Sequence, residues 1–257
     1  MIYKYYIVPQ RVIATEADGF DMDNIVVSTR VRLARNIAGF PFNSAMTVQK
    51  RKALRDKVAA SFTGCNSPVV NEFLVIQMED ISDTDAIRLL EKHLISPEFL
   101  RDRGGKALLL RRDETVSIMI NEEDHLRIQV FSDGYKPDET LDLAQKIDTL
   151  LSEGLNYQKD DKYGFITQCE TNLGSGLRMS FLMRLPALSE SGGMGEIAYN
   201  LNLRGITVRG MYGEGTRAAG AHYQISGKSS LDLLKRQVCE IAGYEQRFRE
   251  AVTGIAI

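Results

Sequence analysis

Apolar residues recur along the chain with two different spacings, and each spacing predicts one type of element. Leu54, Val58 and Phe62 follow one another at four-residue intervals and Gly64 comes next, so residues 47–62 are predicted to form an amphipathic helix that stops at the glycine. Residues 106–111 and 115–120 instead consist of short, largely apolar runs on either side of Arg112-Asp113-Glu114. That arrangement indicates two strands joined in a hairpin.

The spacing of apolar residues predicts helices and strands over the rest of the chain as well, and their order predicts the fold class. Further helices are predicted from Asp83 through Leu94 to Ser96-Pro97, and over residues 137–154, 189–203 and 229–241. Further strands are predicted over residues 24–37, 73–78, 125–131, 165–168, 177–185, 206–209 and 221–225, with residues 73–78 read as buried. Hairpins mixed with helices, without regular alternation of strand and helix, predict an α+β fold with an antiparallel β-sheet flanked by helices.

A block of three acidic residues interrupts this pattern between two predicted strands. It lies in the run Asn121-Glu122-Glu123-Asp124-His125, called the acidic block below. Adjacent carboxylates raise one another's pKa and resist burial, so a positive group is expected to come to this place. One alternative is a solvated acidic turn. Another is a divalent-metal site that includes His125, which is disfavoured because successive residues of a strand point to opposite faces.

Arginines supply candidate positive groups. Arg30 and Arg32 alternate along a predicted strand and therefore share one face, while Arg127, Arg178 and Arg209 lie near predicted strand ends. The chain has no GxxxxGK[ST] run, and Gly174-Ser175-Gly176 lacks the third glycine of a dinucleotide fingerprint. A bound nucleotide would therefore be held by guanidinium groups, which bind phosphate oxygens in bidentate fashion. The alternative is that these are solvated surface arginines.

Composition narrows the classes of protein. The 257 residues are 44% apolar and 26% charged, which is ordinary for a soluble protein, and the net charge of −2 argues against a nucleic-acid partner. No apolar run reaches the ~18 residues that a membrane span needs, and the N-terminus does not resemble a signal peptide. The three cysteines are widely spaced and indicate free thiols, so we expect a cytoplasmic protein with no membrane partner.

Taken together, these runs resemble a known family, the ATP:guanidino phosphotransferases. The residues from Asn121 to Arg127 are identical to that family's N-E-E-D-H-L-R signature. Three further segments resemble its other motifs in the same order: Ser28-Thr29-Arg30-Val31-Arg32-Leu33-Ala34-Arg35-Asn36, Cys169-Glu170-Thr171-Asn172-Leu173-Gly174-Ser175-Gly176-Leu177-Arg178 and Arg209-Gly210-Met211-Tyr212-Gly213-Glu214-Gly215-Thr216. Glu170 replaces the proline usual in the family.

The resemblance implies the fold, the chemistry and the residues that perform it. It implies a guanidino-kinase (glutamine-synthetase-like) catalytic domain over residues 24–257, preceded by an N-terminal arm over residues 1–23. It implies ATP and Mg²⁺ as cofactors, with Mg²⁺ carried on the nucleotide, Glu122 reaching it through water and no direct protein ligand. Glu123 is the implied base, Glu214 a second carboxylate on a mobile loop, and Cys169 an electrostatic aid. The implied nucleotide-binding residues are Arg30, Arg32, His93, Arg127, Arg178 and Arg209.

Within this family the chain is most similar to the bacterial protein arginine kinases of the McsB type. Only about two dozen residues precede the first arginine-bearing strand, where kinases of free guanidino compounds carry a helical domain, and the chain ends after one further helix. The resemblance implies transfer of the γ-phosphoryl group of Mg-ATP to arginine side chains of proteins, in a bacterial stress response. It leaves room for an activator protein, the Clp protease machinery and a homodimer. Two alternatives stay open: a kinase of a free guanidino compound, and a pseudokinase that only binds nucleotide or phosphoarginine.

Overall fold

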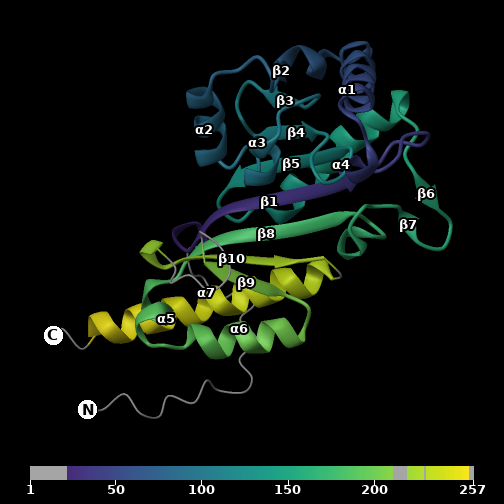
Figure 1. Cartoon of the computed structure of the whole chain (residues 1–257). Coiled ribbons are helices and arrows are strands. Elements are labelled where there is room, and N and C mark those ends of the chain that lie inside the picture. The colour runs from purple at the N-terminus through teal and green to yellow at the C-terminus, as the bar shows by residue number, and fades with distance from the viewer. Residues whose placement is uncertain (1–21, 211–218, 229, 255–257) are drawn as a thin grey trace. The chain divides into compact units, whose positions relative to one another are not determined.

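A computed structural model describes residues 22–210, 219–228 and 230–254 of the chain (Figure 1). The chain divides into two compact units: the larger unit is Thr29–Met179, and the smaller unit combines Met1–Ser28 with Ser180–Ile257. The predicted arm over residues 1–23 lies almost wholly outside the described residues.

Hydrogen bonds join eight strands in the order β2-β3-β4-β5-β1-β8-β10-β9. Their bounds are β1 Val26–Arg35, β2 Phe73–Gln77, β3 Ala107–Arg111, β4 Val116–Ile120, β5 Leu126–Asp133, β8 Leu177–Arg184, β9 Thr207–Gly210 and β10 His222–Gly227. The pairs β2/β3, β3/β4, β4/β5 and β9/β10 are antiparallel, as is the separate pair β6 (Lys159–Asp160) with β7 (Gly164–Phe165). The predicted α+β class is therefore confirmed.

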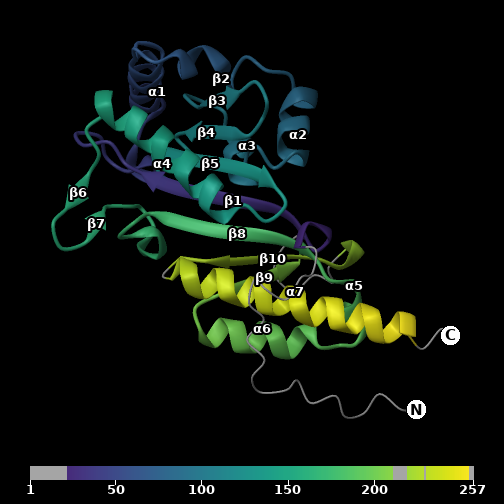
Figure 2. The ribbon, with the colours of Figure 1, turned by 180° about the vertical axis from the view of Figure 1, so that it is seen from behind.

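In the larger unit, helices cover both faces of the sheet (Figures 1 and 2). The helices are α1 (Val48–Thr63), α2 (Asp83–Glu91), α3 (Pro97–Arg101) and α4 (Pro137–Gly154). The ring of Phe73 in β2 packs edge-on against Phe62 of α1, with the centroids 5.0 Å apart. Ile76, three positions further along the same strand, packs on the α2 and α3 side instead. This follows from the two-residue period of a strand, which sends Phe73 and Ile76 to opposite faces.

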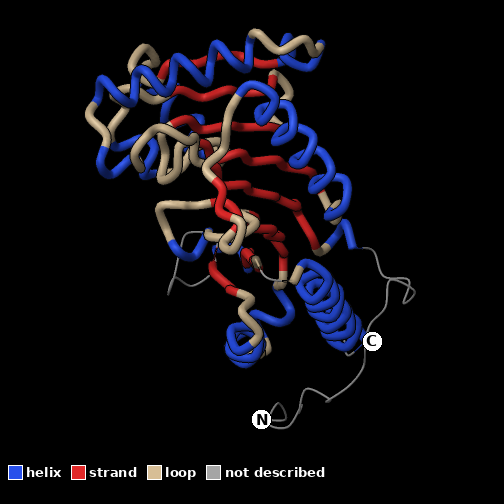
Figure 3. Tube along the Cα trace, turned by 90° about the vertical axis from the view of Figure 1, so that its right-hand side faces the viewer, coloured by secondary structure: helices blue, strands red, loops and turns tan. Residues whose placement is uncertain are grey.

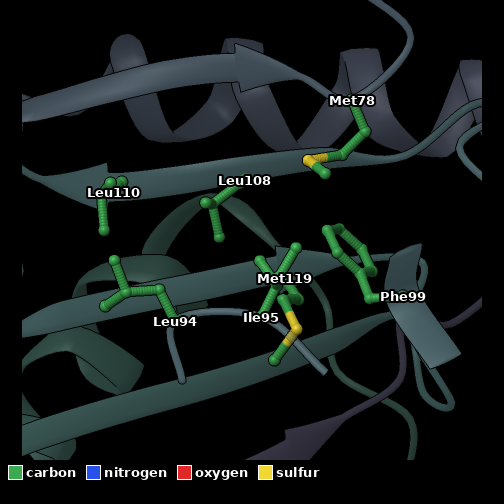
Figure 4. Packing of buried hydrophobic residues seen from close by; sticks show 7 residues of the cluster. All are labelled: Met78, Leu94, Ile95, Phe99, Leu108, Leu110 and Met119. Atoms are coloured by element: carbon green, nitrogen blue, oxygen red, sulfur yellow. The ribbon is translucent and has the colours of Figure 1, made fainter. Parts of the chain in front are cut away.

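A cluster of buried side chains fixes α3 and the segment before it on the sheet (Figure 4). Leu94, Ile95 and Phe99 pack there against Leu108, Leu110, Met78 and Met119. The backbone is held as well, because the carbonyl of Leu94 accepts hydrogen bonds from Ser117 Oγ and from Gln129 Nε2. The four residues from His93 to Ser96 thus have a defined place over β3 and β4.

The smaller unit contains α5 (Pro186–Glu190), α6 (Met194–Leu203) and α7 (Leu231–Gly254), drawn as coils in Figure 3. No side chain of its own caps α5. The buried carboxylate of Glu245, in α7, accepts hydrogen bonds from the backbone N–H groups of Ala187 (3.1 Å) and Leu188 (2.9 Å). Arg249 completes the set by donating to the same carboxylate at 2.7 Å. A long-range cap of this kind stabilises the helix start through tertiary contact.

Several predicted boundaries are wrong for local reasons. The helix expected to carry Leu94 ends at Glu91, because His93 takes a left-handed backbone with φ of 59°. The single helix expected over residues 189–203 is two, α5 and α6, with Gly192 at φ of 77° between them. Strand β2 is an edge strand of the sheet. Its Leu74 and Val75 are exposed, where a buried strand was expected. Of the strand expected over residues 165–168, only Phe165 is in a strand, β7. Among the described residues, no helix has the length and apolar character that a membrane span requires.

Candidate active site

The acidic block is tolerated because its side chains leave the chain in different directions. Asn121 has a left-handed backbone with φ of 67°, and its amide donates to the carbonyls of Arg51 (2.9 Å) and Gly105 (2.7 Å). The turn that begins at Asn121 lets Glu122, Glu123 and Asp124 find separate partners. The expectation that a positive group comes to this block is confirmed for Glu122 and Glu123, and the solvated-turn alternative is wrong.

Glu122 is the buried member of the block, with 2% of its side chain exposed. Its Oε1 lies 2.7 Å from Arg127 Nη1 and accepts a hydrogen bond from Ser96 Oγ at 2.7 Å. Its Oε2 accepts from the backbone N–H of Glu123. Both oxygens are therefore engaged inside the protein, and Glu122 fixes the position of Arg127. A water-bridged contact to Mg²⁺ from Glu122 stays a prediction.

Asp124 and His125 build the fold around the block. Asp124 Oδ1 accepts from Asn36 Nδ2 at 2.6 Å and from the backbone N–H of Gln168 at 2.8 Å. His125 accepts the N–H of Ile37 at Nδ1, and its Nε2 donates to the carbonyl of Pro41. Burial lowers the pKa of His125, which agrees with a neutral ring. With both ring nitrogens engaged, His125 does not ligate a metal, and no group of three or more His, Cys, Asp or Glu suited to a metal lies within the described residues.

Glu123 is the carboxylate that remains accessible, with 37% of its side chain exposed. Its Oε2 lies 3.2 Å from Arg127 Nη2 and 3.3 Å from Asn172 Nδ2. These two donors orient one oxygen and leave the group able to accept a proton from a ligand. Asn172 was not singled out from the sequence, although its place three residues after Cys169 puts it in the same short loop.

Four arginines gather in the larger unit next to these carboxylates. Arg30 and Arg32 lie on β1, Arg127 on β5 and Arg178 on β8. Burial, then the positive charges of Arg127 and Arg178, lower the pKa of Arg30 to about 10. The pKa of Arg32 is lowered by burial first and then by Arg30, Arg127 and Arg178, while Glu122 acts in the opposite direction. These four guanidinium groups therefore lie close enough to one another to interact, and such crowded positive charges are suited to a polyanion.

His93 lies beside this cluster. The backbone N–H groups of His93 and Leu94 donate to the carbonyls of Leu90 (2.9 Å) and Leu89 (3.0 Å), which closes the end of α2 with a left-handed residue at His93. Glycine is usual at such a position, and a histidine there stores strain of about 1 kcal/mol. Partial burial and then the charge of Arg30 lower the pKa of His93, so the ring is held near Arg30. A neutral imidazole at this place can stack on a planar base.

The cysteine loop borders the same carboxylate. Cys169 is half-buried at the start of the 3-10 turn Glu170–Asn172, with its Sγ 3.0 Å from Thr171 Oγ1. Glu170 is exposed. One glycine that follows has a packing role: a Cβ on Gly176 would lie 2.6 Å from the carbonyl oxygen of Ala34. Close approach of β1 and this loop therefore requires glycine there.

Two expected site residues lie elsewhere in the chain. Arg209 is an exposed residue of β9 in the smaller unit. Glu214 lies outside the described residues. The larger unit thus brings together six of the predicted residues: Arg30, Arg32, His93, Glu123, Arg127 and Arg178. For Cys169, the described contact that links its loop to them runs through Asn172.

Comparison with protein families identifies the family of the chain. A model of the ATP:guanido phosphotransferase C-terminal catalytic domain matches residues 54–240. That is more than half of the chain, and the chain therefore belongs to the ATP:guanido phosphotransferase family.

Within the family, similar curated proteins are the protein-arginine kinases, as the motifs predict. The chain is 40% identical over 239 residues to the protein-arginine kinase of Caldanaerobacter subterraneus subsp. tengcongensis, covering 90% of this chain and 71% of that protein. It is 39% identical over 217 residues to that of an Exiguobacterium species and 41% identical over 223 residues to that of Halalkalibacterium halodurans. The alignments cover 84% and 87% of this chain, but only 61% and 62% of those relatives, which is less than two thirds of their length.

Solved structures confirm the fold. Lombricine kinase superposes with a TM-score of 0.76 at 21% identity, covering 91% of this chain and 69% of that one. The duplicated taurocyamine kinase from Schistosoma mansoni superposes with a TM-score of 0.73 at 26% identity, covering 92% of this chain and 36% of that one.

Proposed function

We propose that the chain transfers the γ-phosphoryl group of Mg-ATP to arginine side chains of proteins. The observation that carries the proposal is the four-arginine cluster beside the accessible carboxylate Glu123, in a chain about 40% identical to protein-arginine kinases. A cluster of guanidinium groups stabilises the charge that develops on a transferring phosphoryl group. The carboxylate next to it can receive the proton that the attacking nitrogen must lose.

The nucleotide is bound by side chains in this proposal. Arg30, Arg32, Arg127 and Arg178 contact the triphosphate, and His93 stacks on the adenine. Arg209 is a further phosphate ligand in the proposal. Mg²⁺ neutralises phosphate charge and is carried on the nucleotide without a direct protein ligand. Glu122, held in place by Ser96 and Arg127, reaches the ion through water in this proposal.

The chemical step is a direct, in-line transfer. A guanidinium is a poor nucleophile because it keeps its proton at ordinary pH. As the new N–P bond forms, the bond from γ-phosphorus to the bridging oxygen breaks, and ADP leaves with that electron pair. The nitrogen gives its proton to Glu123. Glu214 orients the guanidinium from its loop, and Cys169, when ionised, favours the cationic substrate electrostatically.

The same proposal covers organisation and partners. Residues 24–257 act as one catalytic domain after an N-terminal arm, in a cytoplasmic protein. Its partners are proteins bearing arginine, with an activator protein, the Clp protease machinery and a second copy of the chain as further candidates.

Mass spectrometry of a generic protein such as casein tests the proposal. After incubation with the chain and Mg-ATP, and with acid avoided throughout, we expect phosphoarginine on casein, and about a hundredfold less or lower still with Glu123→Gln. Turnover of free arginine or another free guanidino compound, with no label on any protein, would assign the chain to the kinases of free guanidino compounds. Nucleotide binding without either product would make it a pseudokinase.

A further inference from the structure

The segment from His93 to Ser96 lies close to active-site residues at both of its ends. At one end the His93 ring lies near Arg30, whose charge lowers the pKa of the ring. At the other end Ser96 Oγ donates to Glu122 Oε1 at 2.7 Å. Between them, Leu94 and Ile95 are buried, with 3% exposure each, so the segment is anchored in the core.

Ser96 has two tasks that its single hydroxyl performs together. Its oxygen accepts the backbone N–H of Phe99 at 3.1 Å, which caps the short helix α3. The same hydroxyl donates a hydrogen bond to Glu122 Oε1, which also lies 2.7 Å from Arg127 Nη1. The same carboxylate oxygen is therefore held by Ser96 and Arg127, while Oε2 is held by the backbone of Glu123.

Arg127 depends on this arrangement for its position. It lies between Glu122 at 2.7 Å and the accessible Glu123 at 3.2 Å. It also faces the other arginines, because its charge lowers the pKa of both Arg30 and Arg32. Left to itself, a guanidinium in such a cluster would move away from its like-charged neighbours. A buried, immobile Glu122 keeps it in place.

We propose that Ser96 is a positioning residue: by fixing Glu122 it holds Arg127 in the phosphate-binding cluster, and so links the His93 end of the segment to the phosphate end. The inference rests on the proposed use of these arginines for nucleotide phosphates. Neither the acidic motif nor the arginine motifs contain Ser96, and its role follows from the hydrogen bonds alone.

The test separates the link to Glu122 from the helix cap. Ser96→Asp keeps a good N-cap residue but places a second carboxylate against Glu122, while Ser96→Ala removes both contacts. Ser96→Thr keeps both. Ser82 provides the matched control, because its hydroxyl caps α2 through Asp85 N at 3.1 Å and donates to the Asp85 carboxylate at 2.7 Å, on an exposed helix end.

The measurement is the dissociation constant of Mg-ATP by calorimetry, with the melting temperature of each full-length variant. We expect Ser96→Asp and Ser96→Ala to weaken Mg-ATP binding about tenfold, as for a buried charge that loses a partner. We expect Ser96→Thr to restore it and Ser82→Ala or Ser82→Asp to leave it unchanged. Wild-type affinity in Ser96→Asp would overturn the inference and leave Ser96 as a helix cap.

The effect of the Ser96 variants on Mg-ATP affinity does not depend on which molecule accepts the phosphoryl group. If the wild-type chain binds Mg-ATP but phosphorylates no arginine, the proposed function fails and the Ser96 comparison still stands on affinities. If phosphoarginine forms and all Ser96 variants bind Mg-ATP like the wild type, only the positioning role fails.

Discussion

Strand β1 carries arginines on both faces. On one face the guanidinium of Arg35 is paired with a carboxylate, and on the other the guanidinium of Arg32 is not. Arg35 is saturated with partners: its Nη2 lies 2.7 Å from Asp148 Oδ2, its Nε donates to the same carboxylate, and its guanidinium lies 3.5 Å from the centre of the Phe165 ring. Arg32, three residues earlier on the other face, forms no hydrogen bond or ion pair with the described part of the chain. It lies near three positive charges, with Glu122 as the opposing charge. Odd and even positions of one strand point to opposite faces, which is what separates them.

The difference separates an arginine that stabilises the fold from the arginines that we propose bind a ligand. The charge of Arg35 is neutralised within the protein, and its own positive charge in turn partly opposes the rise in pKa of the neighbouring Tyr157. The pKa of Arg32 is lowered, so its charged form costs more free energy in the folded chain than in the unfolded chain. A protein gains nothing from such a cluster alone. The cluster becomes favourable when a polyanion binds to it.

The largest expected effect is on the ligand side, at Glu123. If Glu123 is the base, Glu123→Gln should lower kcat by a factor of about 10²–10⁴, because proton transfer from the guanidinium is lost. Mg-ATP affinity should stay close to that of the wild type. Initial rates and calorimetry check both, with the exposed Glu91→Gln as control. Loss of Mg-ATP binding in Glu123→Gln would place this carboxylate in the phosphate site instead.

On the opposite face, Arg35→Ala should act on stability. The side chains of Arg35 and Asp148 are 4% and 16% exposed, so the variant leaves a partly buried carboxylate without its partner. We expect a loss of about 3–5 kcal/mol in the free energy of unfolding. The exposed pair Arg88–Asp85 gives the control, since Arg88→Ala should cost less than about 1 kcal/mol. Urea unfolding of the two variants measures the difference, and equal losses would contradict the comparison.

Removing an arginine of the cluster should cost catalysis. Arg178→Ala and Arg127→Ala should each lose about 3 kcal/mol of transition-state stabilisation, or roughly a hundredfold in kcat/KM. Arg127 also pairs with the buried Glu122, so Arg127→Ala additionally leaves that carboxylate without this partner. Arg111→Ala, which breaks ion pairs with Glu72 and Asp113 on the hairpin, serves as control. Wild-type kcat/KM in both cluster variants would remove them from the phosphate site.

Cys169→Ser should have the smallest effect. In a direct transfer the thiol is never phosphorylated, so the variant loses about tenfold in kcat, the contribution of one contact to a charged group. Phosphopeptide analysis of the wild-type chain during turnover should find no phosphocysteine. A trapped phosphocysteine together with a fully inactive variant would show that Cys169 is a covalent nucleophile.

Local patterns predicted much of the fold and of the site. The periodicity around Leu54, Val58 and Phe62 gave α1 within a residue at each end, because an amphipathic helix with Thr47 and Gly64 as caps carries its own signals. The hairpin around residues 112–114 was likewise predicted. The acidic and arginine motifs identified residues that the larger unit does bring together.

What the sequence could not predict depends on contacts between distant residues. Asp83–Glu91 stops where it does because a histidine adopts a backbone conformation usual for glycine, and tertiary packing of Leu94 supports it. Glu245 caps α5 although it lies 58 positions from Ala187 in the sequence. Asp148 neutralises Arg35 although the two are 113 positions apart. The partners of Glu122 follow the same rule, since Ser96 lies 26 residues before it.

The central claim is that the face of β1 carrying Arg32 is arranged for the phosphates of a nucleotide. Thermal unfolding of the wild type and of Arg32→Met, with and without Mg-ATP, tests it most directly. Because the pKa of Arg32 is lowered, the cost of its charge is fully present below that pKa, and so at neutral pH. We predict that Arg32→Met without nucleotide melts about 2–4 °C higher than the wild type, as expected for ~1 kcal/mol in a chain of this size. Mg-ATP should raise the melting temperature of the wild type and leave that of Arg32→Met almost unchanged. A less stable Arg32→Met that still gains the full shift from Mg-ATP would contradict the claim.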